Sequence, residues 1–133
     1  MEARHGIPVG VATDAANVPE TVLGPAALAT MPVKPGPSPV AVLADKAYDC
    51  DWLRRHLMKR GFVLVAPHRS NRVKPATNDG RRMRRYERRW VVERTFAWLH
   101  SFRRVVTRFE RMVQHFDGFV HLACAFLALE KLI

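Results

Sequence analysis

Residues 40–45 read Val-Ala-Val-Leu-Ala-Asp, and residues 61–67 read Gly-Phe-Val-Leu-Val-Ala-Pro. Each stretch holds a short continuous apolar run, which is the pattern of a strand buried on both faces. Between the runs, Asp49 or Asp51 can cap a helix that extends to residues 59–60, and Gly61 is a stop signal. A strand, a helix and a strand in this order favour a parallel pair with a right-handed crossover. The sequence therefore predicts an α/β fold.

The helix between the two strands has an amphipathic pattern. Its apolar face is predicted to hold Trp52, Leu53, His56 and Leu57, and its opposite face Arg54, Arg55 and Lys59.

The segment before the first apolar run contains two further predicted elements. Residues 6–14 mix β-branched residues with glycine and are typical of a short strand. Residues 19–30 begin with proline and carry Glu20 early, which predicts a helix that is interrupted at Gly24-Pro25. Residues 32–39 contain four prolines and one glycine, so we expect a loop there.

The segment after the second apolar run is basic and then helical. Residues 68–82 show no periodicity and include Pro75, Asn78 and Gly80, so a mobile loop is expected. Residues 83–104 predict one long helix. Residues 113–133 predict another helix, apolar on most sides.

Positive charge is concentrated in one tract of the chain. The 133 residues contain 22 lysines and arginines against 12 acids, a formal net charge of +10, and residues 69–111 hold 14 of these cations against four acids. Such a field favours a polyanion, and nucleic acid is the commonest large one in a cytosol. An anionic membrane surface or a ribosome would be attracted equally well, so an RNA-associated protein stays an alternative.

Cysteine content and hydropathy exclude some classes of protein. Cys50 and Cys124 cannot form a disulfide framework, and we expect free, buried thiols in a cytosolic protein. The longest apolar stretch, residues 118–129, contains His121 and is too short to span a bilayer. The residues after Met1 show no charged segment followed by an apolar stretch, so no secretory signal is expected there.

Two carboxylates stand at positions suited to chemistry. Asp45 directly follows a predicted strand, at the edge where α/β sheets place ligand-binding side chains. Glu93 is predicted mid-helix on a largely apolar stripe, where a carboxylate needs a cation or a metal. Together they suit Mg²⁺, which takes one or two carboxylates and keeps other sites for water and phosphate. The alternatives are that Asp45 caps a turn and that Glu93 pairs with Arg89 or Arg94.

Other side chains have structural explanations. The arginine runs in residues 81–89 can be a solvated helix face. The aromatic side chains of residues 90–102 favour core packing over base stacking, and the set comprises Trp90, Phe96, Trp98 and Phe102. A zinc site from His115, His121 and Cys124 has only three nearby ligands, and core packing suffices to explain them.

Two long motifs, Leu-Ala-Asp-Lys-Ala-Tyr-Asp at residues 43–49 and a second one at residues 86–104, follow one another in the chain. Both resemble motifs of bacterial insertion-sequence transposases of the DDE type, in the group similar to IS-four and IS-five. Residues 43–49, Leu-Ala-Asp-Lys-Ala-Tyr-Asp, resemble the family's LADKGYD block. Residues 86–104 resemble the block around the last catalytic Glu, and the spacing of Tyr86, Arg89 and Glu93 fits the signature called YREK. The segments at residues 6–8, 16–17 and 121–127 are also similar, so the resemblance covers nearly the whole chain.

The resemblance implies a fold, a reaction and a set of site residues. It implies an RNase H-like fold in which Asp, Asp and Glu hold two Mg²⁺ (or Mn²⁺) ions for DNA strand cleavage and strand transfer. Asp45 matches the second acid and Glu93 the third, so both are expected to be catalytic metal ligands. Tyr86 and Arg89 match positions expected to contact DNA phosphate. The signature's last Lys falls on His100, and one of the nearby basic residues can substitute for it, Arg103 or Arg104. Three further basic residues are expected DNA contacts, namely Arg81, Arg82 and Arg85.

The resemblance also predicts what the chain lacks. In the family the first Asp precedes the segment that matches residues 6–8, so residues 1–133 are expected to be the C-terminal part of a DDE catalytic domain, without the first catalytic strand. We therefore expect little or no transposition by this polypeptide alone. The alternative function is a non-catalytic DNA-binding fragment or a regulator of transposition. Expected partners are transposon-end and target DNA, with a second copy or a full-length transposase, in the cytoplasm and not on a membrane.

Overall fold

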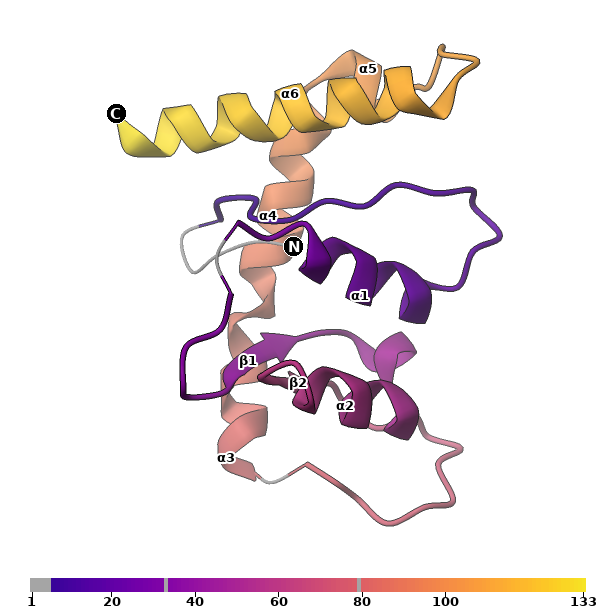
Figure 1. Ribbon diagram of the computed structural model, residues 1–133, viewed down its shortest axis with the longest axis vertical. Helices are drawn as coiled ribbons and strands as arrows, with labels where there is room; N and C mark the ends of the chain where they lie inside the picture. Colours follow the sequence, from indigo (N-terminus) through magenta and orange to yellow (C-terminus); the bar gives the residue numbers. More distant parts are fainter. Residues whose placement is uncertain (1–5, 33, 79) are drawn as a thin grey trace. The chain divides into compact units, whose positions relative to one another are not determined.

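The computed structural model describes residues 6–32, 34–78 and 80–133 (Figure 1). The chain forms two compact units, and each is described by itself. Of the described residues, 19–21, 34–78 and 80–89 form the sheet unit, and 6–18, 22–32 and 90–133 form the helical unit.

The sheet unit is built on two parallel strands joined by a helix. Strand β1 (Val40–Leu43) pairs with β2 (Phe62–Val65) in the register Val40 with Phe62 and Leu43 with Val65. Helix α2 (Asp51–Met58) lies between them in the chain and packs against β2. The predicted parallel β–α–β arrangement is confirmed.

The core of the sheet unit lies between α2 and β2. Leu53 and Val65 are fully buried, because α2 directs its apolar stripe toward β2. Their neighbours in this core are Leu57, Phe62, Leu64 and Ala66. The prediction that both strands are buried on both faces is wrong for β1. Val40 is 44% exposed and the rest of β1 is half-buried, since α2 covers β2 and not β1.

Gly61 ends α2 as expected. Its φ of +80° lies in the left-handed region that favours glycine, and its N–H donates to Met58 O at 3.0 Å. The chain then turns directly into β2, so this glycine sets where the second strand begins.

The predicted continuous helix over residues 83–104 is wrong. The chain forms a short helix α3 (Gly80–Met83), a 3₁₀ segment η2 (Arg84–Arg89), helix α4 (Trp90–Leu99) and helix α5 (Arg103–Val106). Arginines three and four residues apart repel one another on an α-helix, which explains the break where they crowd. They occupy six of nine consecutive positions, Arg81, Arg82, Arg84, Arg85, Arg88 and Arg89.

The helical unit contains α1 (Glu20–Ala29) apart from its first two residues, together with α4, α5 and α6 (Val113–Leu132). The predicted C-terminal helix is confirmed, and α4 and α5 both pack against it. Helix α1 runs through Gly24-Pro25, so the predicted interruption is wrong. The buried core of this unit comprises Leu28, Val91, Thr95, Val120, Ala123, Cys124 and Leu127.

The predicted strand over residues 6–14 does not form, and only an isolated bridge occurs at Pro8. The Thr30 hydroxyl takes the place of a neighbouring strand, because Val11 N–H donates to it at 3.0 Å and it contacts Val11 O at 3.2 Å. Gly10 packs so closely that an added Cβ would lie 2.4 Å from Ala27 O. This segment therefore follows α1 and not a sheet.

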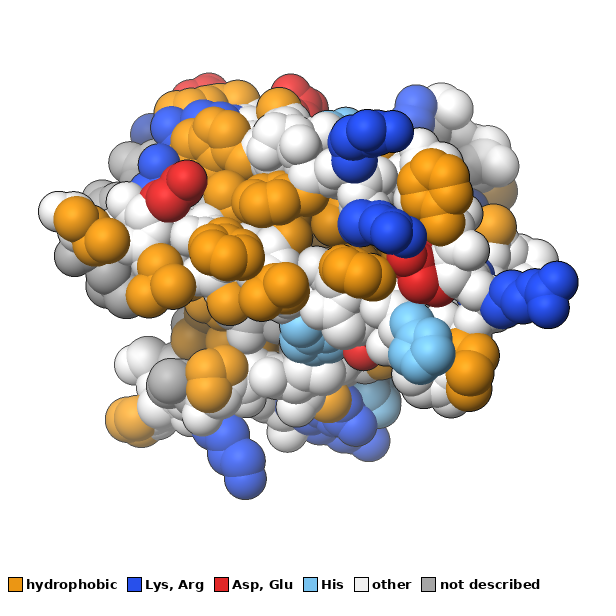
Figure 2. Space-filling model, turned by 90° about the horizontal axis from the view of Figure 1, so that it is seen from above, with side chains coloured by type: hydrophobic (Ala, Val, Ile, Leu, Met, Phe, Trp, Pro, Cys, Tyr) orange, Lys and Arg blue, Asp and Glu red, His pale blue; other side chains and the backbone are white. Residues whose placement is uncertain are grey.

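Apolar side chains remain exposed on the helical unit. The face seen from above, where α6 lies in Figure 1, carries many hydrophobic side chains (Figure 2). Leu122, Phe126 and Leu129 of α6 are each more than half exposed. No helix among the described residues is long and apolar enough to cross a membrane.

The prediction that the aromatic set forms core is only partly right. Phe102 stacks on Phe126 with ring centroids 6.4 Å apart, and Trp98 is half-buried. Trp90 and Phe96 are 55% and 56% exposed.

Candidate functional site

Asp45 lies between the end of β1 and the turn that follows it. Ala44 N–H still donates to Val65 O at 3.0 Å, and the next residue begins the 3₁₀ turn η1 (Lys46–Tyr48). Asp45 Oδ1 accepts the N–H of Ala47 at 2.8 Å, so the carboxylate caps this turn. The cap fixes the carboxylate in a half-buried position beside the carboxyl end of a parallel strand.

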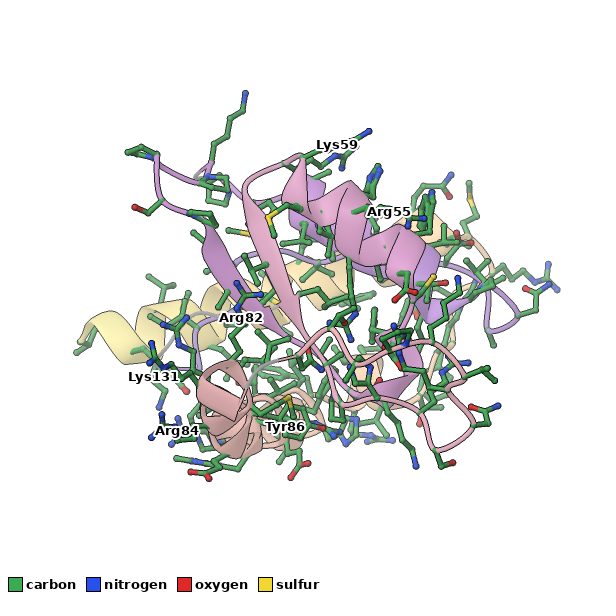
Figure 3. All side chains as sticks on the ribbon, turned by 90° about the horizontal axis from the view of Figure 1, so that it is seen from below. Arg55, Lys59, Arg82, Arg84, Tyr86 and Lys131 are labelled. Carbon is green, nitrogen blue, oxygen red and sulfur yellow. The ribbon has the colours of Figure 1, made fainter. Side chains whose placement is uncertain are left out.

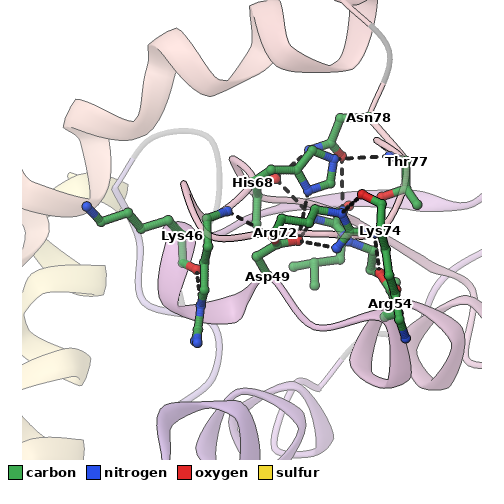
Figure 4. A network of polar contacts seen from close by, with 12 residues as sticks. Lys46, Asp49, Arg54, His68, Arg72, Lys74, Thr77 and Asn78 are labelled. Carbon is green, nitrogen blue, oxygen red and sulfur yellow. Dashed lines mark hydrogen bonds and ion pairs between the residues drawn. The ribbon is translucent and has the colours of Figure 1, made fainter.

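The carboxylate of Asp49 is the centre of a polar network (Figure 4). Its side chain is 2% exposed. Asp49 Oδ1 accepts from Arg54 Nη2 at 2.9 Å, from His68 Nδ1 at 2.9 Å and from Arg72 Nη1 at 3.3 Å. Asp49 Oδ2 accepts the backbone N–H of Arg69 at 2.9 Å. One buried carboxylate thus joins α2 to the segment that follows β2.

Arg54 connects this carboxylate to the end of β2. Its Nη1 donates to Leu64 O and to Asn78 Oδ1, both at 3.0 Å, and its Nη2 donates to Ala66 O at 3.1 Å. The side chain is 13% exposed, so the prediction that Arg54 lies on the solvent face of α2 is wrong. A planar guanidinium can satisfy several carbonyl and carboxylate acceptors at once, which explains why arginine is tolerated here.

Residues 68–78 have no helix or strand but are held by polar contacts. Arg72 donates to Asp51 Oδ1 at 2.8 Å and to Pro75 O, and Thr77 N–H donates to His68 Nε2 at 3.0 Å. Asn78 donates to Ala66 O. The expectation of a mobile loop over residues 68–82 is therefore wrong for this part, which is bound at several points along its length.

The same contacts explain why neither Asp49 nor Asp51 caps α2. The residue at the N-cap is Cys50, and it makes no side-chain capping hydrogen bond. Both carboxylates are used by arginines instead. An ionised carboxylate accepts stronger hydrogen bonds from guanidinium groups than from a neutral backbone N–H.

The network lowers the pKa of Asp49 well below its usual range. Burial alone would raise the pKa, but hydrogen bonds from Arg54, from the backbone of Arg69 and from His68 outweigh it. The hydrogen bond from Arg72 likewise lowers the pKa of Asp51. Asp49 is therefore ionised in the folded protein wherever the network is intact.

This shift predicts an acid-sensitive contribution to stability. A carboxyl group whose pKa is lowered by folding stabilises the protein fully above its unfolded pKa, about 3.9, and the contribution is lost as the pH falls through the lower folded value. We expect the free energy of unfolding to decline below about pH 4. Asp49→Asn should be less stable at neutral pH and show a smaller decline, which urea unfolding at several pH values would measure. An unchanged pH slope in the variant would contradict the assignment.

Basic side chains gather on α3 and η2 of the sheet unit (Figure 3). Arg81, Arg82 and Arg85 are exposed, as the DNA-contact prediction requires. Arg84 and Arg85 line a hollow of about 410 Å³ with Ala41 and Leu43 of β1. The cations of η2 therefore lie beside the strand that leads to Asp45.

Tyr86 and Arg89 lie together. Arg89 Nη1 donates to the Tyr86 hydroxyl at 2.6 Å, and its guanidinium carbon is 5.7 Å from the ring centroid. The 3₁₀ geometry of η2 allows this contact because residues three apart are aligned. Both signature side chains thus belong to one local cluster in the sheet unit.

Glu93 belongs to the helical unit, whereas Asp45 belongs to the sheet unit. It stands in the first turn of α4 and is exposed. The prediction that it lies mid-helix on an apolar stripe is wrong, since η2 ends at Arg89 and α4 buries Val91 and Thr95 instead. Acidic side chains are favourable in the first turn of a helix.

The basic residues near α5 differ in their surroundings. Arg103 is exposed, as is His100, which takes the place of the signature's Lys. Arg104 donates to Glu110 Oε1 at 2.8 Å, and its guanidinium lies 5.4 Å from the ring centroids of Phe109 and Phe119. Arg103 therefore offers the more accessible charge.

No metal cluster is formed within the described ranges. No group of three or more His, Cys, Asp or Glu side chains there could hold a metal ion, and this applies to the alternative zinc site. Cys124 is buried and Cys50 half-buried, and both are free thiols. Burial raises the pKa of the Cys124 thiol, as for an inert core residue.

Comparison with known proteins gives the family. The transposase DDE domain family matches residues 1–127. The chain belongs to this family. It is 37% identical over 134 residues to a protein of Burkholderia cepacia assigned as a transposase for insertion sequence element IS402, a match that covers 96% of this chain and 60% of that protein. It is 39% identical over 92 residues to a Brucella ovis protein assigned as a transposase for IS6501, covering 66% of each.

The chain thus spans about three fifths of the length of its IS402 relative. No solved structure matches the chain. Transposase DDE domains generally use divalent metal ions, and the oxygen donors of Asp45 and Glu93 are of the kind that such ions prefer.

The Asp49 network was missed at the level of sequence. Asp49 lies inside the transposase motif at residues 43–49, only four residues after Asp45. The available signal was the second acid of that motif together with the polar residues after β2, whose hydrogen bonds leave no periodic pattern.

Proposed function

We propose that residues 1–133 are the C-terminal part of the DDE catalytic domain of an insertion-sequence transposase, with an RNase H-like fold. The observation that carries the proposal is the family match over residues 1–127. The parallel β1–α2–β2 unit supports it, because an acid follows the first strand where α/β folds place functional side chains. The proposed reaction is phosphoryl transfer on DNA, namely strand cleavage and strand transfer at transposon ends.

The proposed metal ligands are Asp45 and Glu93. The Ala47 N–H is the hydrogen-bond donor that the described residues give to the Asp45 carboxylate, and it engages Oδ1. Carboxylate side chains suit Mg²⁺ or Mn²⁺, which bind carboxylate oxygen and leave other positions for phosphate and water. When bound, such ions supply activation of the attacking water and stabilisation of the leaving oxygen of a phosphodiester. Asp45 contributes a carboxylate held in place by its own cap.

The proposed DNA contacts lie on α3, η2 and α5. Tyr86 and Arg89 would meet phosphate as one hydrogen-bonded cluster. The other proposed contacts are Arg81, Arg82, Arg85, Arg103 and Arg104. Arg104 would have to give up its hydrogen bond to Glu110 before it could donate to a phosphate. We propose transposon-end and target DNA as partners, with a second copy of the chain or a full-length transposase, in the cytoplasm where bacterial DNA lies.

Salt dependence of DNA binding tests the interface. A variant with Arg81, Arg82 and Arg85 changed to Ala should lose affinity for duplex DNA, and the slope of log affinity against log salt should fall by about 1 for each phosphate contact removed. Fluorescence anisotropy with a labelled duplex at several salt concentrations measures both quantities.

Lys34→Ala is the matched control, because Lys34 is an exposed cation of the same unit outside α3 and η2. Its slope should stay close to that of the unchanged chain. An equal fall for Lys34→Ala and for the arginine variant would show that attraction is general, and would overturn this interface.

A further inference from the structure

A pocket in the sheet unit combines aromatic and cationic side chains apart from the proposed DNA contacts. It has a volume of about 440 Å³, within the range of small-molecule sites. It is formed by the start of α2 and by the segment after β2, which the Asp49 network holds in place. Its lining includes one tryptophan, Trp52, the carboxylates of Asp49 and Asp51, and the cations Arg55, Arg69, Arg72 and Lys74.

Trp52 is unusual in this lining. Its side chain is 54% exposed, although tryptophan is highly buried on average. Its ring stacks on His56 with centroids 5.1 Å apart and an interplanar angle of 17°. The stack holds the indole in one orientation while more than half of its surface stays open.

The charge of the pocket favours an anion. Four cations and two carboxylates line it, a net charge of +2. Arg72 and Lys74 are paired with Asp51. The Arg69 guanidinium donates to the carbonyls of Lys46 and Ala47 and forms no ion pair among the described residues, so its charge is not neutralised.

Arg55 adds a second available cation. It is exposed and has no ion pair within the part of the chain that the structure describes. Figure 3 shows it on α2 with Lys59, which lies one turn further along the same helix and does not line the pocket.

We propose that this pocket binds unpaired DNA, with a base stacked on Trp52 and the adjoining phosphates held by Arg55 and Arg69. A base needs an accessible aromatic face, and the backbone needs cations close to that face. Duplex DNA hides its bases in the stack and offers the pocket phosphate alone. The inference rests on the proposed function, which makes DNA the substrate of this domain.

Tryptophan fluorescence tests the proposal directly. In the chain with Trp90→Phe and Trp98→Phe, Trp52 is the remaining tryptophan. A short oligothymidylate should quench its emission and bind more tightly than a duplex of the same length. Trp52→Ala, followed by anisotropy of a labelled oligothymidylate, should weaken binding by about tenfold, and Trp52→Phe should retain part of the affinity.

Arg55→Ala and Lys59→Ala form a matched pair that separates a site from general attraction. Arg55→Ala should weaken binding of the oligothymidylate several-fold more than Lys59→Ala. Equal effects of the two variants, or equal quenching by duplex and single strand, would overturn the proposal.

The outcome is independent of the test of the proposed function. If oligothymidylate did not bind, while duplex binding kept its expected salt dependence, only the proposal for this pocket would be refuted. If the arginine variant and Lys34→Ala weakened duplex binding equally, while oligothymidylate still quenched Trp52, the proposed duplex interface would be refuted and the pocket would stand.

Discussion

Replacing Asp45 by Asn is expected to lower transposition by about 100-fold or more in an active transposase that contains residues 1–133. The substitution keeps the size of the side chain and an oxygen that can accept the Ala47 N–H, so the η1 turn should persist. It removes the negative charge that a divalent ion requires. Affinity for terminal DNA should be unchanged, because the proposed DNA contacts lie on other elements.

The active protein can be a chimera in which the Burkholderia cepacia relative supplies the parts of its length that the match does not cover. The transposition frequency of a marked element in cells measures activity, and anisotropy with a labelled terminal duplex measures DNA affinity.

Glu93→Gln should lower transposition in the same way. Glu130→Gln, which changes an exposed acid of α6, should stay active. Full activity of Asp45→Asn would refute its assignment as a metal ligand, and a parallel loss of DNA affinity would point to a non-catalytic binding role.

Replacing Asp49 by Ala is expected to lower the free energy of unfolding by about 3–5 kcal/mol. The reason is not only the loss of attraction. Arg54 and Arg72 are largely buried, with exposed fractions of 13% and 11%, and removing the carboxylate leaves their charges without this partner. Urea unfolding followed by circular dichroism measures the change, and the slope with denaturant shows whether the folded state stays equally compact.

Asp14→Ala is the control, since Asp14 is exposed and its carboxylate accepts the N–H of the neighbouring Ala15. It should change the free energy of unfolding by about 0.5 kcal/mol or less. A cost for Asp49→Ala no larger than about 1 kcal/mol, which is typical of an exposed ion pair, would contradict a buried network.

The main elements of the fold could be predicted because each has a strong local cause. The two apolar runs predicted the strands, and the helix between them predicted the parallel pairing. Gly61 predicted the turn between α2 and β2. The long apolar run after Val113 gave α6. These features depend on residues close in the chain or on a simple topological rule.

The errors arose where groups outside the hydrophobic pattern decide the structure. The carbonyls at the end of β2 draw Arg54 inward, although its position on α2 predicts a solvent-facing side chain. The Thr30 hydroxyl replaces a strand partner for Val11. Repulsion among arginines shortens a helix that periodicity alone extends, and this moves Glu93 from the middle of a helix to its first turn. Asp45 was identified by position and motif, and its role in metal binding stays a prediction.

The Asp49 network also has a consequence for how this domain can change over generations. A single carboxylate serves Arg54, His68 and Arg72, which come from two separate segments of the chain. A mutation at Asp49 leaves three positions to be compensated together, whereas a mutation at any one of its partners leaves the other two bonds in place. We expect tolerated variation to accumulate first among the partners and to reach Asp49 last, so that this position constrains the rate at which the whole segment after β2 can diverge.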